Sequence, residues 1–366
     1  MKLRILLLFL IFCSFSCGKR TYYIAEVDNP DRKPNVAFQG FEDLGSPKFE
    51  HLKQKYMLDT VFHGETDEFK RILLLRHWIK SVIAIDDHGD PYPGEGDVEA
   101  IIDNGLKGTG YHCGHYMIVQ NAILNAYGYV TRTLGAGPGV KGGPDGHHGI
   151  DEVWLNRYNK WFLSDNKYDH HFEKNGIPLS ALEIREEFLK NRAADIIVVK
   201  GPGRVPTETD EETKISKERF AQAYTWIEWH GHNDIFTVWP AYTELLVMYN
   251  DDFFRNNVWI WDNKPHWAYS RPEFMKLVDN SDHIYWTPNT ISSDVRIEGR
   301  QASIILDSDT PNLREYQVRT SPGGTWARTD PSFTLDLKKK KYELNFRVMN
   351  LAGVAGPEHR IIIESK

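Results

Sequence analysis

Apolar side chains recur at helical spacing between Asp67 and Ala84, and they form the clearest periodic pattern in the chain. Thr66 is the expected N-cap, since Asp67 and Glu68 then place acidic groups in the first turn. The pattern predicts a helix over residues 67–84 with one apolar face, made by Phe69, Ile72, Leu73, Leu75, Trp78, Ile79 and Val82.

A second apolar helix is predicted from Cys113 to Tyr127, and Gly128 is well placed to end it. A short helix is expected at Val98–Asn104, and the glycine-rich segment 105–110 separates the two. Cys113 therefore stands where a glycine-rich segment turns into the first turn of a helix.

Short apolar and aromatic runs after this helix predict strands. One strand is expected at Val130–Leu134, and two more, at 150–155 and 161–165, are joined into a hairpin by the polar turn 156–160. The run 135–146 is rich in glycine and proline and is expected to be a loop. Loops of this kind often border a functional site.

The texture of the sequence changes again from Thr287 onward. Short strand patterns follow one another with turns between them, at Val295–Ile297, Ala302–Leu306, Glu315–Arg319, Phe333–Leu335, Tyr342–Met349 and Arg360–Ile363. This spacing predicts a small antiparallel β-sandwich over residues 287–366, which resembles immunoglobulin or fibronectin type III modules. Residues 21–55 are polar and irregular. Residues 201–286 are rich in aromatic side chains and form either an extension of the preceding domain or a connecting domain.

The first residues have the pattern of a secretory leader, in which a basic start precedes a short apolar run and small residues. We expect residues 1–16 to be a signal peptide and Cys17 to be the lipidated first residue of a bacterial lipoprotein. Residues 17–55 would then form an N-terminal extension. On this interpretation a lipid anchor at Cys17 holds the exported protein to a membrane of the cell envelope, in the periplasm or on the outer-membrane surface. The alternative is an ordinary cleaved signal, with Cys17 removed or free.

The charge balance excludes one class of partner. The chain has 44 basic and 51 acidic residues, so nucleic acid is not an expected partner, because phosphate binding needs a basic face. The one basic cluster, Lys338–Lys341, lies between two strand patterns and is expected to be a solvated turn.

Cys113 is the cysteine that remains once the leader residue Cys13 and the expected lipid site Cys17 are set aside. An unpaired thiol in an exported protein is either buried and inert or kept for its reactivity. The helix start favours reactivity, because the N–H groups of a first turn lower the pKa of a thiol and can hold an oxyanion. Gly114 leaves room for a substrate, and His112 is a candidate for the oxyanion site or a plain surface group.

A thiol nucleophile also needs a base and a group that orients the base. In the predicted hairpin His148 precedes the first strand and Asp165 ends the second, so antiparallel pairing places them roughly opposite each other. His147 is the alternative base, and Asp151 or Asp169 is the alternative orienting group.

A zinc site is the competing interpretation of the same region. It would draw on Cys113 and on neighbouring histidines, namely His112, His115, His147, His148, His170 and His171. No Cys-x-x-Cys or His-Glu-x-x-His spacing is present, and adjacent histidines on a strand point to opposite faces. We therefore expect neither a metal nor a cofactor.

Three motifs together resemble the transglutaminase-like superfamily: a cysteine that opens a helix, His148-Gly-Ile-Asp-Glu-Val153, and Trp161-Phe-Leu-Ser-Asp165. The helix with Leu73–Ile79 is similar to the one that precedes the family's catalytic helix. The resemblance covers residues 60–185. It implies an α+β fold, with a papain/transglutaminase-like core over 56–200, where the helix that bears the cysteine packs on an antiparallel sheet. It also implies that Cys113 is the nucleophile, His148 the general base and Asp165 the orienting carboxylate.

Three positions depart from the family's pattern and bear on the substrate and oxyanion contacts. Tyr111 stands where glycine is common, Gly149-Ile150 where Ala-Trp is usual, and Asn166 where proline is usual. The expected function is attack on an amide bond of a peptide, protein or glycopeptide. Hydrolysis is favoured over crosslinking for an exported lipoprotein without a metal site.

A surface-anchored glycan- or protein-binding lipoprotein with a vestigial thiol site is the alternative function. Seven tryptophans could build a stacking platform for sugars, or they could be packing residues: Trp226, Trp229, Trp239, Trp259, Trp261, Trp267 and Trp286.

Overall fold

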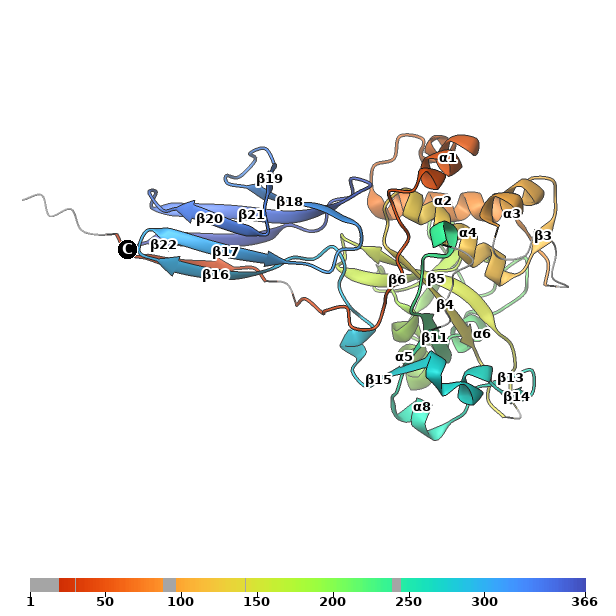
Figure 1. The fold of residues 1–366 in the computed structure, drawn as a ribbon. Helices are drawn as coiled ribbons and strands as arrows, with labels where there is room; N and C mark the ends of the chain where they lie inside the picture. Colours follow the sequence, from red (N-terminus) through yellow and green to blue (C-terminus); the bar gives the residue numbers. More distant parts are fainter. Residues whose placement is uncertain (1–19, 30, 88–96, 142, 239–244) are drawn as a thin grey trace, which may run out of the picture.

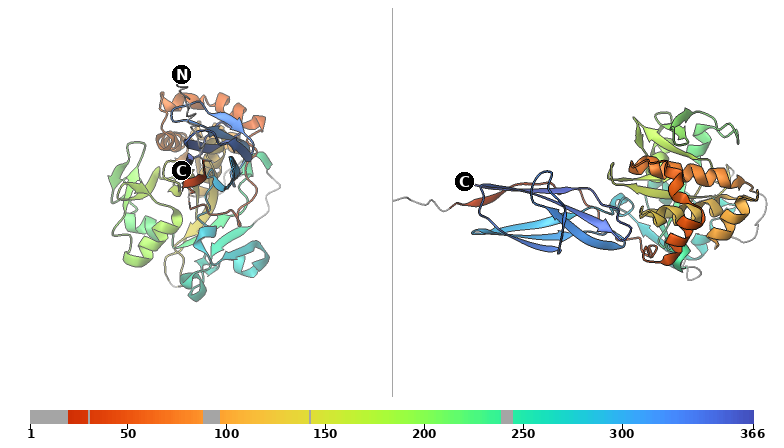
Figure 2. Two further views of the ribbon diagram at one scale, coloured as in Figure 1. Left: turned by 90° about the vertical axis from the view of Figure 1, so that its left-hand side faces the viewer. Right: turned by 90° about the horizontal axis from the view of Figure 1, so that it is seen from above.

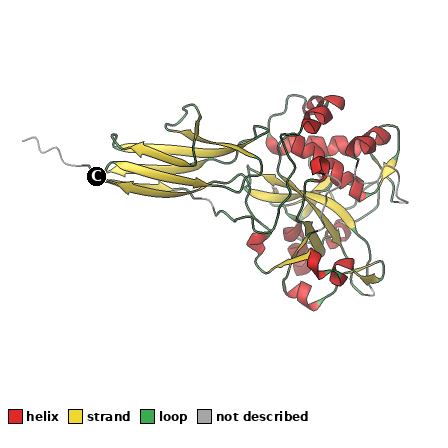
Figure 3. Cartoon of the chain, viewed as in Figure 1, coloured by secondary structure: helices red, strands yellow, loops and turns green. Residues whose placement is uncertain are grey.

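The computed structural model describes residues 20–29, 31–87, 97–141, 143–238 and 245–366. The protein is α+β, and its elements fall into two lobes (Figures 1 and 3). One lobe mixes helices and strands, and the other consists of strands. The two lie end to end, as the view from above also shows (Figure 2). Among the described residues, no helix is both long enough and apolar enough to cross a membrane.

The helices of the mixed lobe include the three that the sequence predicts. The α-helices are α1 (Pro47–Lys55), α2 (Glu68–Val82), α3 (Val98–Gly105), α4 (Cys113–Ala126), α5 (Ala181–Asn191), α6 (Lys217–Gln222), α7 (Ile235–Val238) and α8 (Asp252–Asn256). Four 3-10 helices accompany them, η1 (Leu58–Phe62), η2 (Trp267–Ser270), η3 (Pro272–Phe274) and η4 (Ser281–His283).

The capping of α2 differs from the prediction. Asp67, and not Thr66, is the N-cap, because its carboxylate accepts a hydrogen bond from the N–H of Lys70. Helix α1 was not predicted, although it has a serine cap at Ser46 and proline at its first position. Gly128 ends α4 as expected, with a positive φ of 76°.

A six-stranded sheet forms the centre of the mixed lobe. Its strand order is β15 (Met275–Val278), β12 (Leu246–Tyr249), β11 (Trp226–His230), β4 (Thr131–Gly137), β5 (His148–Leu155) and β6 (Lys160–Ser164). The pairs are antiparallel except β12 with β15. Three strands of the aromatic-rich segment 201–286 therefore belong to the same sheet as the predicted hairpin.

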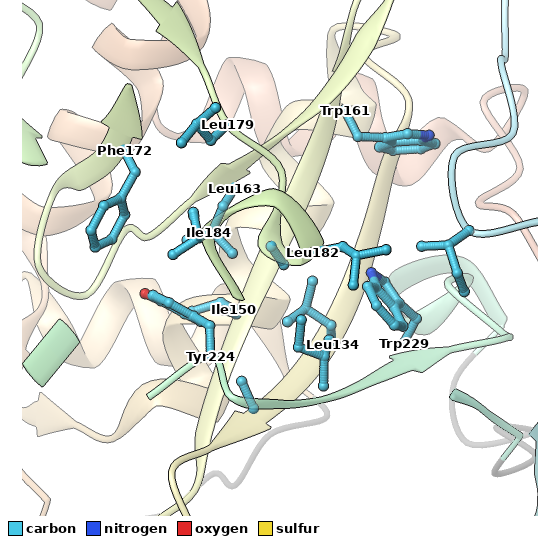
Figure 4. Close-up of a cluster of buried hydrophobic side chains, with 14 of the residues drawn as sticks. Leu134, Ile150, Trp161, Leu163, Phe172, Leu179, Leu182, Ile184, Tyr224 and Trp229 are labelled. Atoms are coloured by element: carbon cyan, nitrogen blue, oxygen red, sulfur yellow. The ribbon is translucent and has the colours of Figure 1, made fainter. Parts of the chain in front are cut away.

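Hydrophobic side chains cover both faces of this sheet, because alternate residues of a strand point to opposite faces. On β5, Ile150 and Trp154 belong to one buried cluster, whereas Val153 and Leu155 belong to another. The first cluster also includes Leu182 and Ile184 from α5, as Figure 4 shows. The second cluster contains the apolar side chains of α4. Helix α4 packs on β4 and β5, and α1, α2 and α3 surround it (Figure 1).

Three small sheets complete this lobe. One has the order β10 (Val205–Thr207), β9 (Ile197–Lys200), β7 (His170–Lys174) and β8 (Ile177–Pro178). The others pair β2 (Ala84–Ile85) with β3 (Gly110–Tyr111), and β13 (Ile260–Trp261) with β14 (Lys264–Pro265). Strand β2 follows the end of α2 and β3 precedes the start of α4, so their pairing ties these two helix ends together.

The all-β lobe contains two antiparallel sheets around one buried cluster. The larger has the order β1 (Tyr22–Val27), β22 (His359–Ser365), β21 (Lys341–Asn350), β18 (Leu313–Arg319) and β19 (Ala327–Thr329). The smaller has β16 (Ser292–Glu298), β17 (Gln301–Asp307) and β20 (Ser332–Asp336). The six predicted strands are present.

The description of residues 21–55 as irregular was wrong at its start. Strand β1 pairs with β22, with Tyr22 opposite Ser365, so the beginning of the described chain forms an edge of the C-terminal lobe. Tyr22 is buried in the cluster of this lobe, whereas Tyr23 is 39% exposed.

We expect Tyr22→Ala to destabilise the all-β lobe by about 3 kcal/mol, since truncation of a buried aromatic side chain leaves a cavity. Tyr23→Ala is the matched control and should change stability by less than about 1 kcal/mol. Hydrogen exchange of the β21 and β22 amides measures both effects. Equal protection in the two variants would show that the Tyr22 side chain does not stabilise this sheet.

Candidate active site

Cys113 is the first residue of α4, at the start of a helix that is buried along most of its length. His112 caps this helix, and its Nδ1 accepts a hydrogen bond of 3.2 Å from the N–H of Gly114. The N–H of Gly114, one of the first-turn N–H groups that can hold an oxyanion, is therefore engaged with His112. The thiol is partly exposed and is unpaired.

The imidazole of His148 lies between Cys113 and a buried carboxylate. Its Nε2 donates to Asp165 Oδ2 at 2.7 Å, and the ring also hydrogen-bonds with the Cys113 sulfur. Because Nε2 is used by Asp165, Nδ1 is the ring nitrogen left for the thiol. The structure thus brings together the three residues that the sequence analysis selected.

The strand register differs slightly from the expected one. Asp151 pairs with Ser164 and Leu155 with Lys160, so His148 and Asp165 are diagonal neighbours and not direct partners. Diagonal neighbours are still within reach of a long side chain. Asp165 lies just beyond β6 and forms an isolated bridge with His170, which turns the chain toward β7.

Side-chain hydrogen bonds hold the hairpin against α4. Gln120 donates to Asp151 Oδ2 at 2.8 Å and to the carbonyl of Ser164 at 2.7 Å, and all three residues are buried. Asn166 donates to the carbonyl of Tyr116 at 2.6 Å. These bonds fix where the strands that carry His148 and Asp165 lie along the axis of α4.

At Gly149, strand β5 lies against the start of α4. A Cβ atom at this position would lie 3.4 Å from the Cα of Gly114 and 3.4 Å from the sulfur of Met117. These are ordinary contact distances, so an alanine, which the resembled family usually has here, would also fit against the helix. This contact brings the backbone of Gly149 within hydrogen-bond reach of Cys113.

The electrostatics favour a thiolate beside an imidazolium. Burial alone would raise the pKa of the Cys113 thiol, but hydrogen bonds from His112 and His148, together with the imidazolium charge, hold that pKa well below 9.0. Burial would lower the pKa of His148, but the charge of Asp165 and the bonds to Asp165 and Cys113 raise it to about 9. The His148 imidazolium in turn overcomes the effect of burial on Asp165 and depresses the pKa of its carboxyl.

Two tyrosines that the sequence analysis missed complete the surroundings of Asp165. The hydroxyl of Tyr224 donates to Asp165 Oδ2 at 3.0 Å, and the N–H of Tyr168 donates to Oδ1 at 3.3 Å. The ring of Tyr168 also lies against that of His148, with centroids 5.4 Å apart. No local signal marks Tyr224, because it lies 59 residues after Asp165 and approaches it only in the fold.

The alternative residues have other partners. His147 Nε2 lies 3.3 Å from Glu228 Oε1, and Asp151 accepts from Gln120. Asp169 accepts from the buried Arg76 at 2.9 Å and lies 2.6 Å from His77. Of the two adjacent histidines, the structure therefore places His148 beside Asp165.

A cleft of about 590 Å³ opens in front of the cysteine. Its wall contains Cys113, His148, charged side chains and aromatic rings, among them Asp87, Asp145, Lys167, Arg219, Tyr168, Tyr224 and Trp261. A second hollow of about 290 Å³ adjoins the other side of Cys113 and is lined by His147, Glu228, Trp261 and Trp267. The thiol thus lies in the wall of both hollows.

Most tryptophans in the described part of the aromatic-rich segment are buried and do not form an exposed platform. Trp226, Trp229, Trp259 and Trp286 are fully buried, while Trp261 is 39% exposed. Trp239, the expected signal peptide 1–16 and Cys17 lie outside the described residues. The four buried tryptophans are therefore packing residues and not part of a surface that could stack on sugars.

Comparison with known proteins adds no relative. Neither the protein-family models nor the curated proteins give a match to this chain. Any statement of function must therefore stand on the site itself.

Proposed function

We propose that this protein is a cysteine-dependent enzyme that attacks amide bonds through Cys113, His148 and Asp165. The observation that carries the proposal is the continuous contact from the thiol at the start of α4, through the imidazole, to the buried carboxylate 2.7 Å from it. An inert thiol does not need a base and an orienting carboxylate beside it, whereas a thiol that acts as a nucleophile requires both.

In the proposed mechanism the Cys113 thiolate attacks the amide carbonyl carbon. The tetrahedral intermediate collapses as His148 donates its proton to the leaving amine, which leaves a thioester on Cys113. The neutral imidazole then takes a proton from the acceptor, water or an amine, as that acceptor attacks the thioester. The C–S bond breaks, which releases the acyl product and restores the Cys113 thiolate beside the His148 imidazolium. Asp165 holds the ring orientation and stabilises its charged form throughout.

The architecture supports a transglutaminase-like core for this chemistry. Helix α4 packs on the antiparallel strands β4 and β5, and the histidine and the carboxylate come from the ends of β5 and β6. The two sheets of the C-terminal lobe are consistent with an immunoglobulin- or fibronectin type III-like module. We propose the same division of the chain into domains that the sequence predicts, with β1 added to the C-terminal module.

The cleft suits a polar substrate of peptide, protein or glycopeptide type, since charged groups of both signs and aromatic rings line it. We propose hydrolysis as the main reaction, because the partly exposed thiol leaves a thioester accessible to water. Export as a lipoprotein anchored through Cys17 remains part of this proposal.

The decisive experiment is a mass-spectrometric search for an acyl adduct on Cys113 after incubation with peptide and glycopeptide pools. An acyl adduct on Cys113 that disappears with time supports the mechanism. When an amine acceptor is added, a released product that carries the amine indicates transfer, and a released carboxylic acid indicates hydrolysis. Cleavage of a pool component with no adduct on Cys113, even after rapid acid quench, would contradict the mechanism.

The rate of Cys113 alkylation by iodoacetamide should report the lowered pKa of the thiol. The thiolate is the reactive form, so alkylation should stay fast at neutral pH and fall only as the pH drops through a midpoint well below 9.0. Peptide mass spectrometry assigns the label to residue 113. His148→Ala should move the midpoint upward, because the imidazolium is then lost. A midpoint close to 9.0 in the wild-type protein would show an ordinary thiol.

A further inference from the structure

Next to the catalytic residues, His147, Glu228 and His266 bring three ligand-type side chains together. Their ligand atoms all lie within 4.8 Å of one another. His147 Nε2 is 3.3 Å from Glu228 Oε1, and His266 Nε2 is 3.3 Å from Glu228 Oε2. His147 directly precedes β5, Glu228 belongs to β11, and His266 directly precedes η2. The fold, and not the local sequence, therefore brings the three residues together.

The carboxylate of Glu228 lacks the contacts that a buried charge requires. Glu228 is 3% exposed and His266 is 2% exposed. Within the described part of the chain, Glu228 Oε2 and His266 Nε2 have no hydrogen-bond partner, and the ion pairs of Glu228 are with the two histidines alone. A buried carboxylate without a full set of partners is unfavourable, and a bound cation would remove that cost.

Gly135 leaves room for His147 Nε2 and Glu228 Oε1 because it has no side chain. A Cβ atom at Gly135 would lie 2.6 Å from both His147 Nε2 and Glu228 Oε1, so any other residue there would displace them. Trp259 and Trp261 stack on the ring of His147, with centroids 5.9 and 4.6 Å away, and Trp259 also stacks on His266. These rings fix the planes of both imidazoles.

We propose that His147, Glu228 and His266 bind a divalent transition-metal ion of the zinc type. Two imidazole nitrogens and one carboxylate oxygen are a common ligand set for zinc, and a fourth position remains for water or for a ligand. His147 and Glu228 lie in the wall of the 290 Å³ hollow that also contains Cys113, so a ligand on the ion can enter from there.

The protonation of His266 is compatible with this role. Ligation through Nε2 requires the proton on Nδ1, and the contact that opposes this is a bond from the N–H of Ala268 to Nδ1 at 3.4 Å. That distance is longer than an ordinary N–H hydrogen bond, so its loss costs little.

The test is a zinc titration of the full chain in its Cys113→Ser form against a chromogenic chelator, after removal of metal by dialysis. The serine variant excludes the thiolate as a ligand. We expect one equivalent of zinc to bind, and the midpoint of thermal unfolding to rise by about 5 °C when zinc is present at about 100 times its Kd.

Glu228→Gln and His266→Gln should each weaken zinc binding by about 100-fold or more, since loss of even an outer partner of a metal site costs about 10–100-fold. His283→Gln, which changes a partly buried histidine of η4, is the matched control and should bind zinc as the parent does. Circular dichroism and the unfolding midpoint without zinc show whether each variant folds. If only one of Glu228→Gln and His266→Gln folds, that variant alone is sufficient for the test.

Three results would overturn the proposal. The parent protein could bind less than about a tenth of an equivalent, which would leave a hydrogen-bonded imidazole–carboxylate cluster. Both glutamine variants could bind zinc as tightly as the parent, which would place the ion elsewhere. Zinc could bind the wild-type chain and not the Cys113→Ser form, which would make the thiolate the ligand. The proposed amide chemistry does not depend on any of these results.

Discussion

Replacement of Cys113 with alanine should reduce turnover by a factor of about 10⁴ or more, because the acyl-enzyme can no longer form. Helix α4 should persist, because Gln120 and Asn166 still tie the helix and the hairpin together. The measurement is the rate of product formation from whichever pool component gives an adduct on the wild-type protein.

Thr109→Ala is the matched control for this change. It also converts a small, partly exposed polar side chain to alanine, four residues before the cysteine and outside the contacts of the triad. We expect it to retain activity within about twofold. Turnover that survived in Cys113→Ala at the level of Thr109→Ala would remove Cys113 from the reaction.

The candidate triad could be predicted from sequence because each member has a local signal. Cys113 follows a glycine-rich segment and opens an apolar helix, and His148 and Asp165 flank a hairpin with a short polar turn. The predicted strand register differs from the observed one by about two positions. His148 and Asp165 are therefore diagonal neighbours and not direct partners, yet their side chains still hydrogen-bond. The resemblance to a family supplied the packing of hairpin on helix, for which Gln120 is now the visible contact.

Long-range contacts could not be predicted in the same way. Strand β1 shows mostly exposed positions, so its sequence has little of the alternation that marks a strand, and its partner β22 lies at the other end of the chain. Tyr224 and Glu228 belong to a segment whose place in the central sheet depends on the pairing of β11 with β4. Nothing near either residue in the sequence indicates that pairing.

Glycines caused a specific error at the end of β4. The run from Gly135 was expected to be a loop, but β4 continues to Gly137 as a buried central strand. Glycine in a strand often marks a close approach of other atoms. That is its role here, because Cβ atoms at Gly135 and Gly137 would lie 2.6 Å from Glu228 Oε1 and from the carbonyl oxygen of Gly146. Of these glycines, which suggested a loop, Gly135 lines the second hollow and Gly137 lines the larger cleft.

Asp165→Asn should lower turnover by up to about 10⁴, the loss that follows when the orienting carboxylate of a Ser-His-Asp triad is neutralised. The amide is nearly isosteric, so the fold should be kept, but it is neutral and no longer stabilises the imidazolium by its charge. Since the charge of Asp165 raises the pKa of His148 and that imidazolium lowers the pKa of Cys113, the variant should also move the midpoint of Cys113 alkylation to higher pH.

Tyr224→Phe separates this charge effect from simple loosening of the site. It removes one hydrogen bond of 3.0 Å to Asp165 Oδ2 but keeps the charge and the buried ring. A bond to a charged acceptor contributes about 1.5 kcal/mol, so turnover should fall by about tenfold, with a small upward shift of the alkylation midpoint. If Asp165→Asn and Tyr224→Phe lowered turnover equally and left the midpoint unchanged, the carboxylate would serve packing alone. A graded loss, large for the charge and small for the hydroxyl, would show that Asp165 acts on the thiol through His148.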